Sequence, residues 1–428
     1  AVGYQRRHDS MNRQYDINFT QFNAAFRFGA SNVRGELTTN AQFVELALPL
    51  LETLDLQVAV RREDFKQLNQ STTDPKISVI WRPNDSFSGR LSWGQSFRVG
   101  SILQLVGPQT IVSNTDDPFA DTSFFIPWIS EGQPNLQPEI SEAFNIGISW
   151  APVEGMFEGF TVNADYWTYT YEDLITKQSA PAILFEDGCA RANARAAGGG
   201  LAAPSRCDRS SWFSGSATAQ VQSQVVRNAN GAPVRILPDF INANEAEAAG
   251  LDFDIGYTWN TASFGTFNFQ AMAAWYLTYD VEAGGVNYDG IGSMNNVTPI
   301  ARPLPEWKVN YNINWTMDRH SVFWQTRFVS DVEWDSGWSS ARRLRVLAAT
   351  GRDIGTYAAG EHELGGSTYS DVYYTYQLPW GATESSITVG FRNVFDEGVD
   401  VANNANGYSA IMQDARGRMW MVRYRMGF

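Results

Sequence analysis

The sequence predicts an all-β fold: a transmembrane antiparallel β-barrel with short periplasmic turns and long extracellular loops. Three observations carry this prediction. Strand-length segments place apolar residues at every second position, aromatic residues stand at the ends of those apolar faces, and short connections alternate with long ones. Because the side chains of a strand point to alternate faces, a period of two separates an apolar face from a polar one.

The composition limits the classes of protein that fit. The chain has 428 residues, of which 43% are hydrophobic and 14% aromatic, with 15 Trp. It contains no run of about 18 apolar residues, which excludes a helical membrane span. Outer-membrane barrels use Trp and Tyr in interfacial girdles, and carbohydrate-binding β proteins are the alternative. The net charge of −14 argues against a nucleic-acid partner, since phosphates attract basic surfaces.

The alternating segments follow one another along the whole chain. The segment "EWKVNYNINW" is the clearest, with Trp307 and Trp315 at the two ends of its apolar face and Lys308 on the other face. In "GLDFDIGYTW", Asp252 and Asp254 lie opposite an apolar face. The pattern predicts about fourteen strands, with approximate starts at residues 1, 38, 53, 75, 86, 141, 157, 248, 264, 305, 320, 366, 384 and 416.

The last of these segments, "RGRMWMVRYRMGF", is also two-faced. Arg423 and Arg425 lie on one face, and an apolar set lies on the other. That set includes Val422, Tyr424, Met426 and Phe428. If the apolar face meets lipid, we expect this set to point outward and the two arginines to point inward.

The connections are of two kinds. Short turns such as "RPNDS" and "MDRHS" alternate with long segments at about 99–141, 177–245, 281–303, 331–366 and 396–415. Many strands also reach the roughly 9–11 residues that a tilted strand needs to cross a bilayer. A soluble sandwich has no reason to alternate its connections in this way, so the pattern favours a membrane barrel.

The two cysteines, Cys189 and Cys207, bound one segment rich in Gly, Ala and Arg. In a chain with no other cysteine, they suggest a disulfide that closes a loop in an oxidising compartment. Two free thiols are the alternative. A metal site is not expected, because the three histidines are remote in sequence.

The sequence offers no catalytic constellation, so we expect neither an enzyme nor a cofactor. Asp252 and Asp254 could form an acid pair, but a solvated polar lining is the favoured explanation. Asp116, Asp117 and Asp121 could offer calcium ligands, yet their spacing is not that of an EF-hand and a polar loop is favoured.

Aromatic residues in the long connections are the candidate ligand-binding residues. Planar rings on exposed loops can stack on sugars or hold a chelate, and they can equally pack the loops together. The candidates are Phe124, Phe125, Trp128, Trp212, Phe213, Trp334 and Trp338.

Arginines also project from several predicted strands. If they face the barrel lumen, they could form a path for an anionic ligand. Pairing with acids of the lumen and of a plug inside it is favoured, since buried cations need partners. These arginines are Arg61, Arg90, Arg327, Arg392, Arg423 and Arg425.

Several motifs resemble those of TonB-dependent outer-membrane receptors. The stretch "GQPNLQPEISEAFNIGISWAP", followed by "GFTVNADYWTYTYEDLI", is similar to a mid-barrel signature of that family. The segments "RLSWGQSFRVGS", "ANEAEAAGLDFDIGYTW", "FRNVFDE" and "DARGRMWMVRYRMGF" also resemble family strands and turns, in family order. The resemblance implies an outer-membrane transporter that captures a scarce nutrient at its loops and imports it through a plug-gated barrel.

The resemblance also implies partners and a boundary. Family barrels have about 22 strands around a plug, so residues 1–428 are expected to be the C-terminal portion of the barrel, without the plug and about eight strands. Expected partners are lipid and lipopolysaccharide, the plug and N-terminal strands, TonB through the N-terminal region, the barrel-assembly machinery and a nutrient ligand. The assembly machinery would recognise the last strand. In this reading, Arg423, Arg425, Asp252, Asp254 and Lys308 face the lumen or plug.

Two other functions remain open from the sequence. A passive porin shares the barrel pattern but has neither plug nor TonB dependence. A secreted carbohydrate-binding or hydrolytic β protein would explain the Trp content but would be soluble. The substrate also stays open among ferric chelates, carbohydrates, cobalamin-like cofactors and peptides, because loops that set specificity vary freely.

Overall fold

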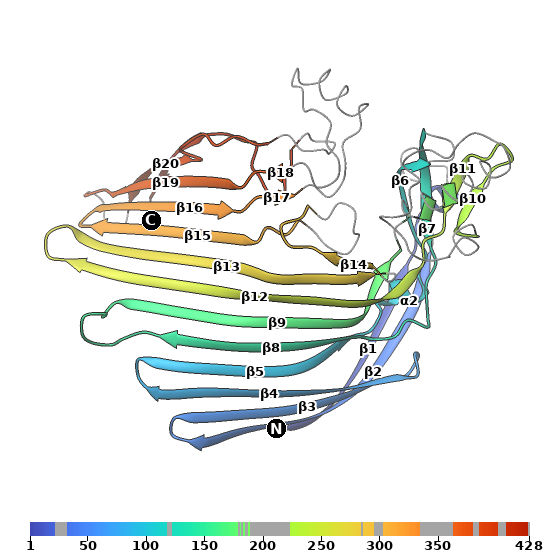
Figure 1. Ribbon diagram of the computed structural model, residues 1–428, viewed down its shortest axis with the longest axis horizontal. Helices are drawn as coiled ribbons and strands as arrows, with labels where there is room; N and C mark the ends of the chain where they lie inside the picture. The colour runs from blue at the N-terminus through green and yellow to red at the C-terminus, as the bar shows by residue number, and fades with distance from the viewer. Residues whose placement is uncertain are drawn as a thin grey trace.

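A long antiparallel sheet, drawn in Figure 1, dominates the computed structural model. The structure describes residues 1–21, 32–117, 122–178, 180, 183–184, 187–188, 223–283, 286–294, 303–333, 363–379, 385–400 and 408–426. Within these residues, no helix is both long and apolar enough to span a membrane. Short helices include α1 (Ile17–Thr20) and α2 (Ile102–Val106).

Fourteen strands follow one another across this sheet in chain order, which confirms the predicted strand pattern. They are β1 (Val2–Arg13), β2 (Val33–Leu51), β3 (Leu54–Phe65), β4 (Gln70–Asn84), β5 (Phe87–Arg98), β8 (Glu139–Trp150), β9 (Phe160–Lys177), β12 (Phe240–Thr261), β13 (Gly265–Ala283), β15 (Trp307–Met317), β16 (His320–Val329), β19 (Ser367–Gln377), β20 (Ser386–Arg392) and β21 (Met419–Arg425). The short β14 (Val286–Asp289) pairs with the end of β13.

The sheet is open. Among the described residues, β1 pairs with β2 alone and β21 with β20 alone. Each of these two strands therefore leaves one edge available for a further strand.

One face of the sheet is continuously apolar. Directly opposed residues of antiparallel strands share a face, so the register can be followed from strand to strand. An unbroken apolar row runs from β2 to β15 through Leu48, Leu56, Val79, Leu91, Ile146, Tyr166, Leu251, Trp275 and Trp307. Many side chains of this face are exposed, as expected of a surface that meets lipid.

Aromatic rings border the apolar face at both ends of the central strands. Trp275 stacks on Trp307 at one end, with ring centroids 4.8 Å apart. At the other end, Phe267 lies 6.4 Å from Trp315 and 5.5 Å from Trp259. These two aromatic rows are placed as the interfacial girdles of a transmembrane sheet would be.

The short turns gather at one edge of the sheet, on the left in Figure 1, and the long connections at the opposite edge. One connection departs from the alternation. The β3–β4 hairpin is short although it lies at the edge of the long connections. Asn69 makes this possible because it adopts a left-handed backbone with φ of 53°, which asparagine tolerates in tight turns.

Two of the long connections are more ordered than the sequence suggested. We expected loops at 99–141 and 177–245, and this is wrong for parts of both. They contain β6 (Gln109–Asp117), β7 (Thr122–Ser130), β10 (Val225–Arg227) and β11 (Pro233–Ile236), which form a separate sheet in the order β10-β11-β7-β6. We call this the loop sheet; it stands at the right of Figure 1. A two-stranded sheet joins β17 (Val332–Glu333) to β18 (Glu363–Leu364).

The loop sheet folds because it buries its own apolar core. Ile126, Leu184, Val225 and Ile236 belong to a cluster of buried side chains contributed by both connections. Neither connection alone supplies the whole cluster. The core forms only where side chains of the two connections pack together, so the sequence of either connection does not predict it.

Candidate functional site

Charged side chains on the polar face of the long sheet form ion pairs across strands. Arg90 of β5 donates from Nε to Asp165 of β9 over 2.7 Å, and its terminal nitrogen contacts the other carboxylate oxygen. Arg327 of β16 bonds to Asp371 of β19 at 3.1 Å. A third pair, Arg61 with Glu63, lies within β3. These three arginines therefore pair with acids of the polar face, which is consistent with the favoured expectation of acid pairing.

The register places the other predicted polar residues on this same face. Asp252 lies opposite Asp165 on one side and Ala274 on the other, and Ala274 in turn lies opposite Lys308. Asp254 accepts a hydrogen bond of 3.3 Å from the amide of Gln270. Asp252 and Asp254 belong to β12 and Lys308 to β15, with β13 between them, so they form a polar lining rather than a cluster.

The two arginines of β21 lie at the edge of the long sheet. Arg423 is opposite Thr388 and Arg425 opposite Ser386, while Val422 and Tyr424 share the apolar face with Val389 and Ile387. All four β21 side chains and that of Met426 are exposed. Phe428 lies outside the described residues.

A buried ion triad ties the loop sheet together. Arg227 of β10 donates to Asp117 of β6 over 2.5 and 3.0 Å, and to Asp187, from the 177–245 connection, over 2.8 Å. Both carboxylate side chains are 0% exposed, and that of Arg227 is 6% exposed. Burial alone would lower the pKa of Arg227, but the hydrogen bonds that it donates to both aspartates raise its pKa above the ordinary value.

The triad changes the interpretation of the acidic loop segment. Of the three aspartates weighed as calcium ligands, only the side chain of Asp117 is described, and its two oxygens contact Arg227. A guanidinium therefore already supplies the positive charge at this carboxylate.

Two of the candidate loop aromatics take part in the core of the loop sheet. Phe124 and Trp128 pack against its buried cluster, and the indole Nε1 of Trp128 donates to Thr115 Oγ1 over 2.9 Å. Phe125, in contrast, is 61% exposed. The other candidates, Trp212, Phe213, Trp334 and Trp338, lie outside the described residues, as do Cys189 and Cys207.

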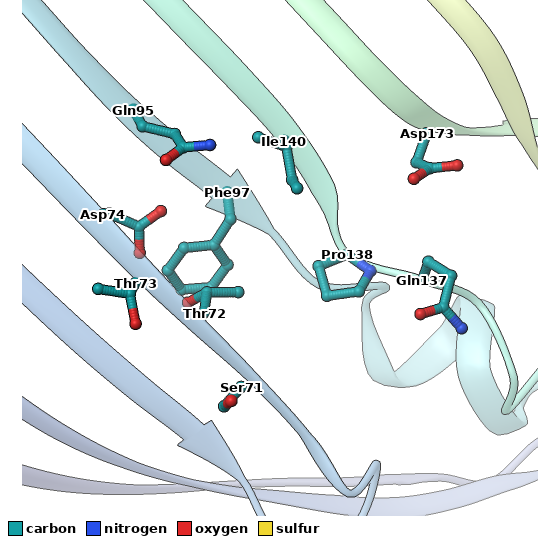
Figure 2. Close-up of a pocket in the computed structure, with 10 residues that line it drawn as sticks. All are labelled: Ser71, Thr72, Thr73, Asp74, Gln95, Phe97, Gln137, Pro138, Ile140 and Asp173. Carbon is teal, nitrogen blue, oxygen red and sulfur yellow. The ribbon is translucent and has the colours of Figure 1, made fainter.

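A cavity of about 330 Å³ lies where two strands of the long sheet diverge. The β4–β5 ladder ends at the pair Lys76 and Gly94, so the strands separate toward the edge of the long connections. Figure 2 shows Thr72, Asp74 and Phe97 in the space that opens between them. No motif marks this cavity, because it depends on where a ladder stops rather than on residue type.

An exposed ion pair in the β20–β21 connection has a testable pH dependence. Arg416 donates from Nε to Asp414 over 2.8 Å, and this hydrogen bond lowers the pKa of Asp414 from 3.8 to about 2. A lowered carboxyl pKa means that the pair stabilises the connection above pH 3.8 and stops doing so as the pH falls through about 2.

We expect Arg416→Gln to move the titration midpoint of Asp414 upward toward 3.8. Carbon-detected NMR of the labelled Asp414 carboxyl measures this midpoint directly. Arg418→Gln is the matched control, since Arg418 contacts Asp396 through its backbone amide. A midpoint that stays near 2 in Arg416→Gln would show that another group holds the carboxylate.

Comparison with known protein families identifies one matching family. Residues 1–394 match the family described as "TonB dependent receptor-like, beta-barrel". No curated protein matches the sequence.

Solved structures share the fold. The siderophore receptor PirA from Acinetobacter baumannii superimposes with a TM-score of 0.57 at 14% identity, covering 98% of this chain and 50% of that one. A variant of the ferric enterobactin receptor PfeA from Pseudomonas aeruginosa, in complex with enterobactin, gives 0.58 at 12% identity, with 98% and 50% covered. The copper transporter OprC gives 0.51 at 12% identity, with 100% and 54% covered. The chain thus spans about half the length of these structures, and identities this low show the fold alone.

Proposed function

We propose that this chain, which belongs to the TonB-dependent receptor-like β-barrel family, forms the C-terminal portion of an outer-membrane transporter that takes up a scarce nutrient. The observation that carries the proposal is the two-faced sheet. Its apolar face is continuous and bordered by aromatic rings, as lipid requires, and its opposite face is polar and ion-paired, as a lumen requires.

The remainder of the barrel would close the two open edges of the sheet. Further strands would pair with β1 and β21, and a plug would fill the space on the polar face. Asp252, Lys308 and Arg423 lie on that face and would contact the plug or lumen water. TonB would act through the N-terminal region of the receptor, outside these residues.

The other proposed partners follow from position on the sheet. The aromatic borders would lie at the lipid and lipopolysaccharide headgroups. The apolar side of the last strand, Val422 to Phe428, would be recognised by the barrel-assembly machinery. The chain would supply wall and loops but perform no chemical reaction. A nutrient would first meet the loop sheet and the neighbouring connections.

Uptake is tested by growth of a strain that lacks the gene. The strain is grown with iron, copper, cobalamin, oligosaccharide or peptide as the single limiting nutrient, the first two supplied as chelates. We expect one limitation to abolish growth, and the restored gene to rescue it only when TonB is present. Rescue without TonB would favour the passive porin, and normal growth under every limitation would contradict uptake altogether.

A further inference from the structure

A group of aromatic side chains lies on the polar face of the long sheet, away from the lipid-facing girdles. On β9, Trp167, Tyr169 and Tyr171 occupy successive positions on the face that carries Asp165. Their register partners on β8 are Asn145, Ala143 and Ser141. A role at the lipid interface does not explain aromatic rings on this face. We therefore look for their role on the polar side of the sheet.

Small residues of β12 provide the floor for these rings. Gly250, Ala248 and Ala246 lie opposite Trp167, Tyr169 and Tyr171. A β-carbon at Gly250 would stand 2.5 Å from an indole carbon of Trp167. The indole therefore occupies the space that a side chain at position 250 would need, and a larger residue there would displace it.

Two further rings extend the group on the far side of β12. Tyr276 and Tyr279 of β13 lie opposite Gly250 and Ala248. Trp167 meets Tyr276 edge to face, with centroids 5.9 Å apart. We call the five rings of Trp167, Tyr169, Tyr171, Tyr276 and Tyr279 the aromatic platform.

The aromatic platform is extended and accessible. Tyr169 and Tyr171 are nearly parallel, with centroids 6.4 Å apart and an interplanar angle of 22°. Tyr169 is 40% exposed. The four residue steps from Trp167 to Tyr171 span about 13 Å of strand, which is long enough to contact more than one ring of a ligand.

The charges beside the platform are balanced rather than basic. Lys308 of β15 places its ammonium 5.3 Å from the ring centre of Tyr276. Asp252 of β12 stands on the same face, two strands away from Lys308. Arg90 is already paired with Asp165. An anionic chelate would need a surplus of cations, which the described residues around the platform do not supply.

We propose that the aromatic platform binds a neutral oligosaccharide through its sugar rings. Flat aromatic rings offer apolar contact to the faces of sugars, while the tyrosine hydroxyls, Asp252 and Lys308 can hydrogen-bond sugar hydroxyls at the edges. The proposal rests on the proposed transport function and names its substrate class. The ligand would slide along β9 inside the barrel, beyond the loops where it is first captured.

The cavity between β4 and β5 has the same chemical character. Its lining combines the ring of Phe97 with the amides of Gln95 and Gln137 and the hydroxyl of Thr72. Its described lining residues include neither lysine nor arginine. Asp173, which follows Tyr171 by two residues on β9, is also part of this lining. Polar and aromatic groups that suit a sugar therefore extend from the aromatic platform toward the edge of the long connections.

The test is direct binding to the receptor purified from outer membranes in detergent. Maltotriose, cellotriose and xylotriose are each titrated by calorimetry. A ferric tricatecholate is titrated separately, as the alternative class of ligand. We expect at least one trisaccharide to bind, and Trp167→Ala and Tyr169→Ala each to weaken it about tenfold or more. Tyr166→Ala is the matched control, since Tyr166 is the neighbour of Trp167 on the apolar face; its affinity should stay within about twofold.

Three results would overturn the proposal. None of the trisaccharides binds; or the platform variants bind as tightly as the wild type; or the ferric tricatecholate binds and loses affinity in the same variants. These outcomes are separate from failure of transport, because growth on a limiting metal chelate with TonB present would uphold uptake while the platform proposal fell.

Discussion

An arginine in place of Tyr311 is expected to destabilise the long sheet in a lipid bilayer by about 2–4 kcal/mol. Tyr311 lies on the apolar face of β15, midway between Trp307 and Trp315, and is 37% exposed. If the two tryptophans mark the membrane interfaces, this position is near the bilayer midplane, where a guanidinium loses its hydration and finds no partner. Urea unfolding in phospholipid vesicles measures the loss.

Asn312→Arg is the matched control for this experiment. Asn312 is the next residue on the same strand and at nearly the same depth, but it faces Gln270 and Gln325 on the polar side. Its side-chain oxygen has no hydrogen-bond partner among the described residues. We expect a change of less than about 1 kcal/mol, because polar-face substitutions remain hydrated. Equal losses in the two variants would contradict the assignment of the faces.

Arg227→Ala is expected to unfold the loop sheet while leaving the long sheet intact. The change leaves the carboxylates of Asp117 and Asp187 buried without their guanidinium. Removing one partner from a buried ion network typically costs about 3–5 kcal/mol. Hydrogen exchange should therefore accelerate at the amides of β6, β7, β10 and β11 and remain slow in β9 and β12.

Two further variants separate charge from packing. Arg235→Ala, on the adjacent strand β11, removes an exposed arginine and should change exchange little. Replacing Arg227 by Met together with Asp117→Leu and Asp187→Leu removes all three charges, and should restore most of the protection. Slow exchange in Arg227→Ala itself would show that the apolar cluster, and not the triad, holds the loop sheet.

The fourteen strands could be predicted because each carries its own signal. In β15, Trp307 to Trp315 alternates apolar and polar residues without a break, and the pleat of a strand turns that alternation into two faces whatever lies beside it. The pairing of Arg90 and Arg327 with acids could also be anticipated, since a cation on a crowded face requires a partner. Chain order then fixed the neighbours, because consecutive strands joined by turns pair with each other.

The loop sheet could not be predicted, because its core and its ion triad draw on two connections separated by two strands of the long sheet, β8 and β9. The aromatic platform likewise combines residues that are distant in sequence. The spacing of Trp167, Tyr169 and Tyr171 is visible in the sequence of β9. The small residues beneath them, Gly250 and Ala248, belong to β12. Sequence alone thus determined which face of each strand is apolar, a local property with a period of two. Tertiary structure decided which side chains from different strands and connections meet, since that depends on register and on where ladders end.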